Sequence, residues 1–344
     1  DLLQVTARVA AARLALAPPT QPSPTVTLAT THGPIAGRMR AMTAPTVHTI
    51  GPVRIHIGSQ SGKYPDGNQV IVHGADTRIA FDTPLVANRI GPEFDEVDSV
   101  ILGHVHEDHT AGLHRVPRAA VQAHHADLAA AQSWDGLCRH YGYAPEALAS
   151  LRSTIEASHH WVPRPDATGY ADGAVWDLGG GVRVRAHHLP GHTAGHCALV
   201  EESEGVAFIG DIDLTGFGPY YGDASSSLAQ FRQSLRRVRE IDARAWVTSH
   251  HKGVVTDRVA FLQALDAFAA RIDNREARLL AYLAERPHTL AALADRGVLY
   301  PPGTALPWVG AAERRTIEQH LDELVAAGAV RVDEGGVYAL AGGG

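Results

Sequence analysis

Short apolar runs separated by turn residues dominate the first two thirds of the chain and predict β-strands. Residues 53–57 alternate apolar and polar side chains, which is typical of a half-buried strand. Residues 69–73 and 78–81 have the pattern of a hairpin. The wholly apolar run at 100–102 indicates a buried strand. A mostly helical stretch should follow from about residue 123 to residue 156, where Ala and Leu recur at helical spacing.

The next part of the chain repeats the order of strands followed by helix. Strands are expected at residues 182–186 and 206–209, and a helix with one apolar face at 227–241. A short strand at 245–247 and a helix at 257–270 close this region. Two β-rich halves, each followed by helix, predict an α+β fold in which two sheets pack face to face with helices outside.

A smaller unit begins near residue 274. Its expected elements are two short helices, a longer third helix and a hairpin, at residues 277–283, 290–293, 311–326, 330–332 and 337–340. Three helices and a hairpin form the pattern of a winged-helix domain. Acidic residues outnumber arginines here, and Glu318, Asp322 and Glu323 on the third helix would repel phosphate. We therefore expect this unit to serve packing or the formation of a homodimer rather than DNA binding.

These patterns divide the 344 residues into three parts. We expect residues 1–46, which are rich in Pro, Thr and Ala, to form an N-terminal arm or linker, residues 47–272 to form the large domain, and residues 273–344 to form the winged-helix-like domain.

Composition narrows the classes of function. A formal net charge of −7 argues against binding to nucleic acid or to acidic membranes. No apolar run approaches the roughly 20 residues that span a bilayer. The only cysteines, Cys138 and Cys197, fit a reducing compartment, so we expect a cytoplasmic protein without a disulfide framework. The 21 histidines are unusual and make a metal site worth testing.

The strip His-Val-His-Glu-Asp-His at residues 104–109 is the strongest chemical signal. It follows the buried strand at 100–102 and the small hinge residue Gly103. Neighbouring side chains of a strand point to opposite faces, so only a tight loop after the strand can bring these side chains to one point. Imidazole nitrogens and carboxylate oxygens are ligands for zinc and related metals.

Three other predicted strands also end in small residues followed by a candidate ligand. The turn after the strand at 182–186 carries His192, Gly210 precedes Asp211, and Ser249 precedes His250. Two metals that share a carboxylate need about seven protein ligands. The seven candidates are His104, His106, Asp108, His109, His192, Asp211 and His250.

This arrangement resembles the metallo-β-lactamase superfamily. The resemblance rests on the strip at 104–109, the Pro-Gly-His-Thr-Ala-Gly-His turn at 190–196, the Gly-Asp at 210–211 and the final His250, and it runs in order through about residues 50–270. It implies an αββα sandwich of four layers with a dinuclear metal centre. One metal would then be held by His104, His106 and His192, and the other by Asp108, His109 and His250, with Asp211 between them. Some members also carry a C-terminal winged helix.

The departures from the family pattern limit the reaction. Members that hydrolyse β-lactam antibiotics commonly place Cys or Ser at the position of Asp211, so antibiotic hydrolysis is not expected. Asp82-Thr83-Pro84 stands where Asp-Thr-Gly is common, which keeps the supporting carboxylate but stiffens the turn. Glyoxalase-II-like thioesterases share all seven ligands, but their helical glutathione-binding region is not evident in this sequence.

The predicted function is hydrolysis of a small acyl substrate, a thioester, ester or lactone, by a hydroxide bridging two divalent metal ions. Zinc is favoured, with iron and manganese as alternatives. Asp108 is the predicted catalytic residue, which would orient the hydroxide as well as bind metal. A metal-dependent nuclease or phosphodiesterase is the alternative, and a di-iron redox enzyme ranks below both.

Several assignments stay open at this stage. His250 is preferred over His251 as the last ligand, and Asp211 over Asp213, because each stands closer to its predicted strand. His196 is expected to fix the turn rather than to bind metal. Tyr64, Tyr221 and Lys252 are the candidates for substrate contact, from loops expected to surround the metals.

Overall fold

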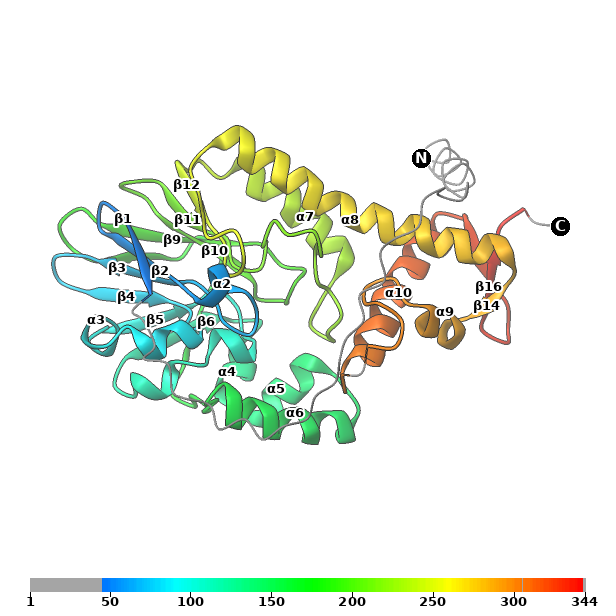
Figure 1. Ribbon diagram of the computed structural model, residues 1–344, viewed down its shortest axis with the longest axis horizontal. Helices are drawn as coiled ribbons and strands as arrows, with labels where there is room; N and C mark the ends of the chain where they lie inside the picture. Colours follow the sequence, from blue (N-terminus) through cyan, green and yellow to red (C-terminus); the bar gives the residue numbers. More distant parts are fainter. Residues whose placement is uncertain (1–44, 305, 343–344) are drawn as a thin grey trace, which may run out of the picture.

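The computed structural model describes residues 45–304 and 306–342 of the chain. Almost all of the predicted N-terminal arm, residues 1–46, therefore lies outside the described residues. The described part contains two large sheets, the helices that cover them and a smaller unit reached through one long helix (Figure 1).

The first sheet has seven strands in chain order, from β1 to β7. The pairs from β1 to β4 are antiparallel, whereas β4, β5, β6 and β7 run parallel to one another. Its strands are β1 Thr46–Ile50, β2 Val53–Ile57, β3 Gln69–His73, β4 Arg78–Phe81, β5 Ser99–Leu102, β6 Ala120–His124 and β7 Thr168–Tyr170. The predicted hairpin of β3 and β4 is confirmed.

The second sheet has six strands in the order β13-β12-β11-β10-β9-β8. Only β11 and β12 are parallel neighbours in it. Its strands are β8 Val175–Asp177, β9 Arg183–His188, β10 Cys197–Glu201, β11 Val206–Phe208, β12 Ala245–Val247 and β13 Val254–Val255.

The alternation of side chains along the strands builds four layers, as predicted. In β5, Ile101 packs between the two sheets, whereas Val100 and Leu102 face the helices that cover the first sheet. In β12, Val247 packs between the sheets and Trp246 faces the helices that cover the second. A strand buried on both faces reads as a continuous apolar run, which is why these segments lack alternation in the sequence.

Two groups of helices cover the outer faces of the sheets (Figure 1). The helices that pack on the first sheet are α3 Pro92–Asp95, α4 Leu128–Gln132, α5 Trp134–Tyr141 and α6 Pro145–Ser158. The second sheet is covered by α7 Leu228–Arg237 and by the first half of α8 Arg258–Glu285. The short helix α2 Ser59–Gly62 and the 3-10 turns η1 Leu85–Arg89, η2 Glu107–His109, η3 Leu113–Arg115 and η4 Val238–Glu240 lie in the connections.

Two predicted boundaries differ from the structure. The helical stretch expected from residue 123 begins only at Leu128, because Ala120–His124 pairs with β5 and β7 as strand β6. The two helices expected at 257–270 and 277–283 are one continuous helix, α8. The 270–277 segment lacks Gly and Pro, so nothing in it interrupts a helix whose first half is buried by one core and whose second half is buried by another.

The C-terminal unit packs around the second half of α8. It contains α9 Leu290–Arg296, α10 Val309–Ala326 and a three-stranded sheet in the order β14-β16-β15. The strands of this sheet are β14 His288–Thr289, β15 Val330–Val332 and β16 Val337–Leu340. The predicted third helix and hairpin are therefore present, with a separate apolar core that includes Leu279, Leu293 and Leu321.

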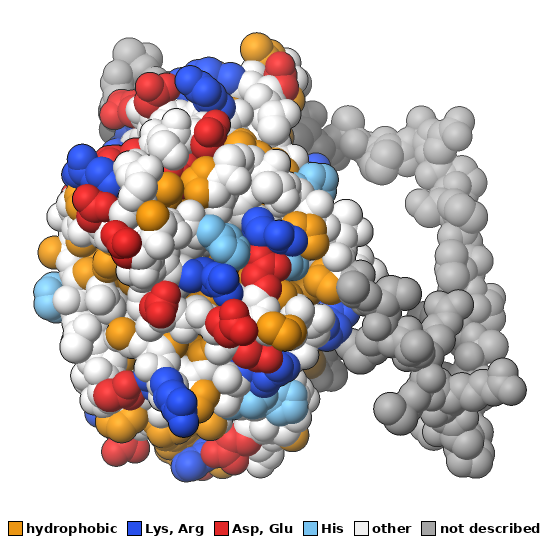
Figure 2. Space-filling view, turned by 90° about the vertical axis from the view of Figure 1, so that its left-hand side faces the viewer, with side chains coloured by type: hydrophobic (Ala, Val, Ile, Leu, Met, Phe, Trp, Pro, Cys, Tyr) orange, Lys and Arg blue, Asp and Glu red, His pale blue; other side chains and the backbone are white. Residues whose placement is uncertain are grey.

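No helix within the described ranges combines the length and apolar character needed to cross a bilayer. Figure 2 shows the face of the molecule at the left of Figure 1, where acidic and basic side chains are interspersed rather than gathered by sign.

Candidate metal centre

The site forms where the carboxyl ends of the parallel strands of both sheets meet. β5 ends at Leu102 and leads through Gly103 into the histidine strip, and η2 turns the strip so that its side chains converge. Asp82, directly after the parallel neighbour β4, accepts a hydrogen bond from the backbone N–H of Gly103 at 2.7 Å. The end of one strand thus fixes the start of the loop that carries most of the candidate ligands.

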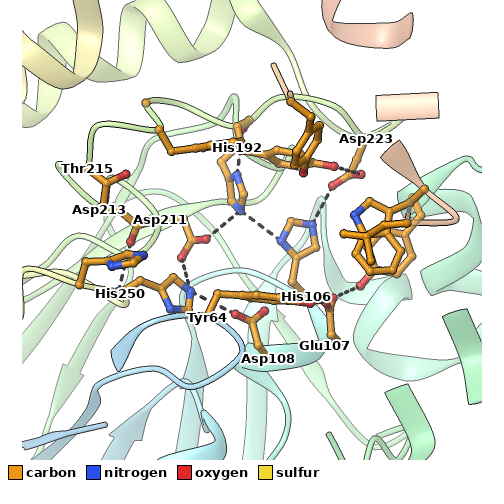
Figure 3. Close-up of a pocket in the computed structure, with 18 of the residues that line it drawn as sticks. Tyr64, His106, Glu107, Asp108, His192, Asp211, Asp213, Thr215, Asp223 and His250 are labelled. Carbon is orange, nitrogen blue, oxygen red and sulfur yellow. Dashed lines mark hydrogen bonds and ion pairs between the residues drawn. The ribbon is translucent and has the colours of Figure 1, made fainter. Parts of the chain in front are cut away.

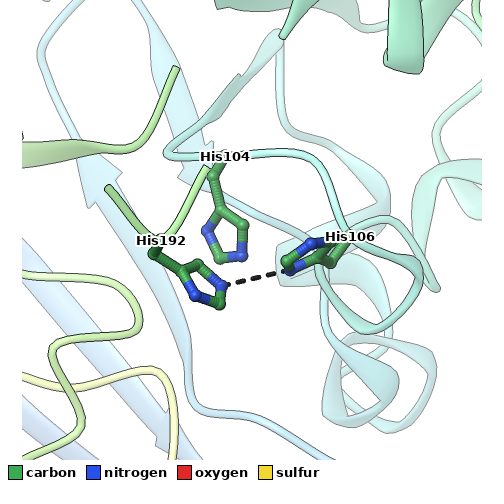
Figure 4. Close-up of side chains that lie close together, drawn as sticks. All are labelled: His104, His106 and His192. Carbon is green, nitrogen blue, oxygen red and sulfur yellow. Dashed lines mark hydrogen bonds between the residues drawn. The ribbon is translucent and has the colours of Figure 1, made fainter. Parts of the chain in front are cut away.

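Three imidazoles form the first cluster (Figure 4). His104 and His106 come from the loop after β5, and His192 comes from the turn that joins β9 to β10. Nε2 of His192 lies 3.1 Å from Nδ1 of His106, and all three side chains are buried. Each offers a nitrogen within 4.8 Å of the others, which is a spacing that one ion can bridge.

A second cluster lies beside the first and combines Asp108, His109 and His250. Nε2 of His250 lies 3.1 Å from Oδ2 of Asp108. His250 follows β12 and is 4% exposed, whereas its neighbour His251 is exposed to solvent. The structure therefore brings His250, and not His251, into the cluster.

Asp211 stands between the two clusters (Figure 3). Its Oδ2 lies 3.3 Å from Nε2 of His192, and its Oδ1 lies 3.1 Å from Nε2 of His109 and 3.7 Å from Nε2 of His250. One carboxylate thus presents one oxygen to each cluster. β11 and β12 are parallel neighbours, which places Asp211 and His250 at the same edge of the second sheet.

The outer nitrogens of four of these imidazoles are held by oxygen acceptors, which fixes their inner nitrogens toward the site. Nδ1 of His109 donates to Asp82 at 2.8 Å, Nδ1 of His192 to the carbonyl of Tyr220 at 3.0 Å, and Nδ1 of His250 to the carbonyls of Gly62 and Asp66 at 2.9 Å. Nε2 of His106 donates to Asp223 at 3.0 Å. Metal-binding histidines generally have this arrangement, because the outer hydrogen bond sets the tautomer.

The inner atoms of the site lack the partners that buried polar groups require. Within the described residues, neither ring nitrogen of His104 has a hydrogen-bond partner, and neither Nε2 of His109 nor Oδ1 of Asp211 makes a hydrogen bond of acceptable geometry. A buried imidazole without a partner costs free energy. Nitrogen and carboxylate donors aimed at two common points fit divalent metal ions, which would satisfy these atoms.

The imidazoles of the centre strongly affect the pKa values of its two carboxylates, Asp211 and Asp108. Burial alone would raise the pKa of Asp211, but the surrounding imidazoles, His109 foremost, hold it well below its usual range. Burial also opposes ionisation of Asp108, and His109 and His250 again outweigh it and lower its pKa. Both carboxylates are therefore anionic near neutral pH, as metal ligands must be.

Two neighbouring residues have supporting roles. Nδ1 of His196 bonds the carbonyl of Leu189 at 3.1 Å, and its Nε2 accepts the backbone N–H of Asp211 at 3.1 Å. Both of its nitrogens are used, which confirms the expectation that His196 fixes the turn. Asp213 accepts the backbone N–H of His250 at 3.1 Å, and burial followed by the charge of Asp211 raises the pKa of Asp213 to about 8.

Two carboxylates that support the site were missed in the sequence analysis. Asp127 accepts hydrogen bonds from the backbone of Gly195 at 2.7 Å and from the hydroxyl of Thr193 at 2.6 Å, and it lies 3.3 Å from the backbone nitrogen of Val105. It therefore ties the 190–196 turn to the histidine strip. Asp223 is the second, and no motif marks either residue.

A pocket of about 390 Å³ opens onto the two clusters. Tyr64 lines it, as predicted, and donates its hydroxyl to Glu107 at 3.0 Å. Its other aromatic lining residues are Tyr141, Tyr143, Phe217, Tyr220, Tyr300 and Trp308. The last two belong to the C-terminal unit, so both units of the chain form its wall.

Two of the predicted substrate contacts do not line the pocket. Tyr221 is fully buried and its hydroxyl lies 2.9 Å from Nε2 of His320 in α10. The side chains of adjacent residues point in different directions, so Tyr220 faces the pocket instead. Lys252 is exposed and also lies outside the lining, whereas His250 and His251 are within it.

The part of the chain that carries the candidate ligands is also the part that resembles known proteins. A family model described as the metallo-beta-lactamase superfamily matches residues 74–250. The chain is 26% identical over 265 residues to an atrochrysone carboxyl ACP thioesterase of Pseudocercospora fijiensis, a match covering 73% of this chain and 68% of that protein. It is 27% identical over 190 residues to a hydroxyacylglutathione hydrolase of Shewanella loihica, covering 55% of this chain and 58% of that protein.

Solved structures show the same fold. A metallo-beta-lactamase family protein from Thermus thermophilus superposes with a TM-score of 0.60 at 26% identity, over 80% of this chain and 93% of that one. A beta-lactamase domain protein from Burkholderia ambifaria gives a TM-score of 0.59 at 21% identity, over 90% of this chain and 97% of that one.

Proposed function

The chain belongs to the metallo-beta-lactamase superfamily and is a hydrolase of that superfamily, and we propose that it cleaves a small acyl substrate, a thioester, ester or lactone, with two divalent metal ions. The observation that carries this proposal is the position of Asp211, whose two oxygens face two separate clusters of candidate ligands.

We assign one ion to His104, His106 and His192 and the other to Asp108, His109 and His250, with Asp211 between them. Six of these seven residues are 7% exposed or less, and the side chain of Asp211 is 14% exposed. Mixed nitrogen and carboxylate donors favour zinc, and iron and manganese are the alternatives.

When bound, the two ions would polarise the scissile carbonyl and lower the pKa of a water molecule toward neutrality. The protein's own contribution is to place the reacting groups. Asp108 is a carboxylate at neutral pH and can accept a hydrogen bond from the attacking water, which would orient it. The aromatic wall binds the acyl group of the substrate by apolar contact and excludes bulk water from it.

An acyl substrate is favoured over a phosphodiester for two reasons. Seven of the residues that line the pocket beside the centre are Tyr, Phe or Trp, and neither Lys nor Arg is among its described lining residues, whereas a nucleotide chain needs positive charge. The two curated relatives are also named as a thioesterase and as a hydroxyacylglutathione hydrolase. A metal-dependent nuclease or phosphodiesterase is the alternative function.

A substrate panel tests the proposal. The purified protein would be assayed with thioesters, lactones and bis-p-nitrophenyl phosphate, with its metal content measured by elemental analysis. We expect turnover of an acyl substrate and zinc in the protein. Turnover of the phosphodiester alone would favour the nuclease, and iron with no hydrolysis in any arm would favour redox chemistry.

The division of the chain into domains and its location in the cell are part of the same proposal. We infer that residues 273–344 form a winged-helix-like domain that serves packing or dimerisation, and that residues 47–272 form the catalytic domain. Two unpaired cysteines, Cys138 and Cys197, support a cytoplasmic location.

A further inference from the structure

A second cavity, of about 400 Å³, lies beside the catalytic pocket. One face of α8 forms one side of it, and the segment from Arg296 to Pro302 forms the other. Phe217 and Tyr300 line both cavities, and their ring centroids lie 5.6 Å apart. The second cavity is therefore separated from the catalytic pocket by a partition of two aromatic rings.

Arginine is concentrated in this second cavity. Arg271, Arg275 and Arg278 are at positions i, i+4 and i+7 of α8 and so share one helix face, and Arg296 faces them from the end of α9. No acidic side chain is among the described residues that line the cavity. This is the reverse of the acidic composition of the C-terminal unit as a whole.

Two of the four arginines already have structural partners. Arg275 donates to the carbonyls of Pro219 and Phe217, the latter at 2.7 Å, and so holds the loop that carries the partition. Arg296 pairs with Glu285 at 2.6 and 2.9 Å and stacks on Tyr282. The charge of Arg296 is largely compensated, but that of Arg275 is not.

The other two arginines are available. Across residues 45–304 and 306–342, neither Arg271 nor Arg278 lies within ion-pairing distance of a carboxylate. Among the described residues, Arg278 donates only to the carbonyl of Val298, at 3.3 Å. Several guanidinium groups that share a concave surface without a counter-charge create a positive potential, and their planar forks match carboxylate and phosphate oxygens.

We propose that this cavity binds the anionic end of the substrate, the phosphate or carboxylate group of the carrier to which the acyl group is attached. The proposal rests on the proposed acyl hydrolysis. Arg271 and Arg278 are the binding residues, and Arg275 positions the loop between the cavities. The scissile bond would lie at the metal centre, the acyl group against the aromatic wall and the charged carrier beyond Phe217 and Tyr300. The substrate class is thus an acyl thioester of an anionic thiol.

Three thioesters with the same acyl group test this. Acyl-coenzyme A carries phosphates, acyl-glutathione carries carboxylates, and acyl-N-acetylcysteamine is neutral. We expect kcat/KM for one charged carrier to exceed that for the neutral one by about tenfold or more, since charged hydrogen bonds are the strong ones. The preferred carrier identifies phosphate or carboxylate. In Arg271→Gln/Arg278→Gln this ratio should fall toward one.

The matched control is Arg236→Gln/Arg286→Gln, which removes the same charge from exposed positions outside both cavities. It should keep the wild-type ratio. An equal fall in both double variants would assign the preference to overall charge and overturn the site. A ratio near one in the wild-type protein, with the neutral thioester hydrolysed, would also overturn it while leaving the proposed function intact.

Direct binding gives a readout that does not depend on turnover. Calorimetric titration with desulfo-coenzyme A and with S-methylglutathione, which lack a free thiol, should show binding of one of them to the wild-type protein and at least about tenfold weaker binding to Arg271→Gln/Arg278→Gln. If this difference appears but no thioester is hydrolysed, the anion site stands and the proposed function fails. Equal affinities in both proteins, each with an unchanged unfolding midpoint, would overturn the site.

Discussion

Nε2 of His106 lies 3.0 Å from Oδ2 of Asp223, although 117 positions separate the two residues in the chain. Burial works against the charged form of His106, but the hydrogen bond and the charge of Asp223 outweigh it and raise the pKa of His106 to about 9. The same contact directs Nδ1 of His106 toward His192, inside the first cluster. Asp223 is therefore a positioning residue for a proposed ligand.

Replacing Asp223 with Ala should weaken metal binding at the first cluster by about 10- to 100-fold, because the imidazole loses the acceptor that orients it. Asp223→Asn should restore part of the affinity, since its amide oxygen can still accept the N–H. Competition with a chromophoric chelator measures the affinity. Asp242→Ala, which removes an exposed carboxylate, is the control. Equal affinities for Asp223→Ala and the control would refute the positioning role.

Substitutions of the neighbours Tyr220 and Tyr221 should have different effects, one on substrate binding and the other on stability. Tyr221→Phe leaves the buried Nε2 of His320 without its hydroxyl partner and should lower the free energy of unfolding by about 1–3 kcal/mol. Tyr220→Phe removes a hydroxyl that donates to Asp223 at 3.1 Å in the pocket and should instead raise KM for the acyl substrate. Urea unfolding and steady-state kinetics measure the two effects. If KM changed only in Tyr221→Phe, the result would contradict the role of Tyr220 and support the sequence-based prediction that Tyr221 contacts the substrate.

Six of the seven candidate ligands could be found from the sequence because they follow strands whose apolar pattern is strong, whereas His192 follows β9, in which only Val184 and Ala186 are apolar. β5, β11 and β12 end within three residues of His104, Asp211 and His250, and the sheets align these ends. The local apolar pattern located the strand ends, and the pairing of the strands brought these ends together, so both pointed to the same residues.

The supporting carboxylates could not be found in that way. Asp127 and Asp223 act through contacts with residues more than 20 positions away, and an isolated Asp in a loop has no periodicity or spacing that marks it. The choice between Tyr220 and Tyr221 depends on how α10 packs: Nε2 of Gln319 donates to the carbonyl of Tyr221 at 2.8 Å, and Oε1 of Gln319 accepts the N–H of Leu228 at 2.6 Å. The position of the C-terminal unit at the pocket was likewise a tertiary feature.

The C-terminal wall of the pocket should select for the length of the acyl group. Leu306 lines the pocket and is 45% exposed, so Leu306→Ala leaves no cavity in the core. We expect kcat/KM for an octanoyl thioester to fall by up to about tenfold relative to the acetyl thioester, because apolar contact is worth about 0.8 kcal/mol per buried methylene. Val332→Ala, at an equally exposed position outside the pocket, is the control. Equal losses for both acyl lengths would place the acyl group elsewhere.

The central claim is that two metal ions, held on either side of Asp211, are required for hydrolysis. Its most direct test is the rate of hydrolysis of a neutral thioester by metal-stripped protein as zinc is added back. The account predicts negligible turnover without metal, a rise that ends at about two ions per chain, and no recovery in His104→Ala/Asp211→Ala. Full activity in the metal-free protein, or saturation at a single ion, would contradict it.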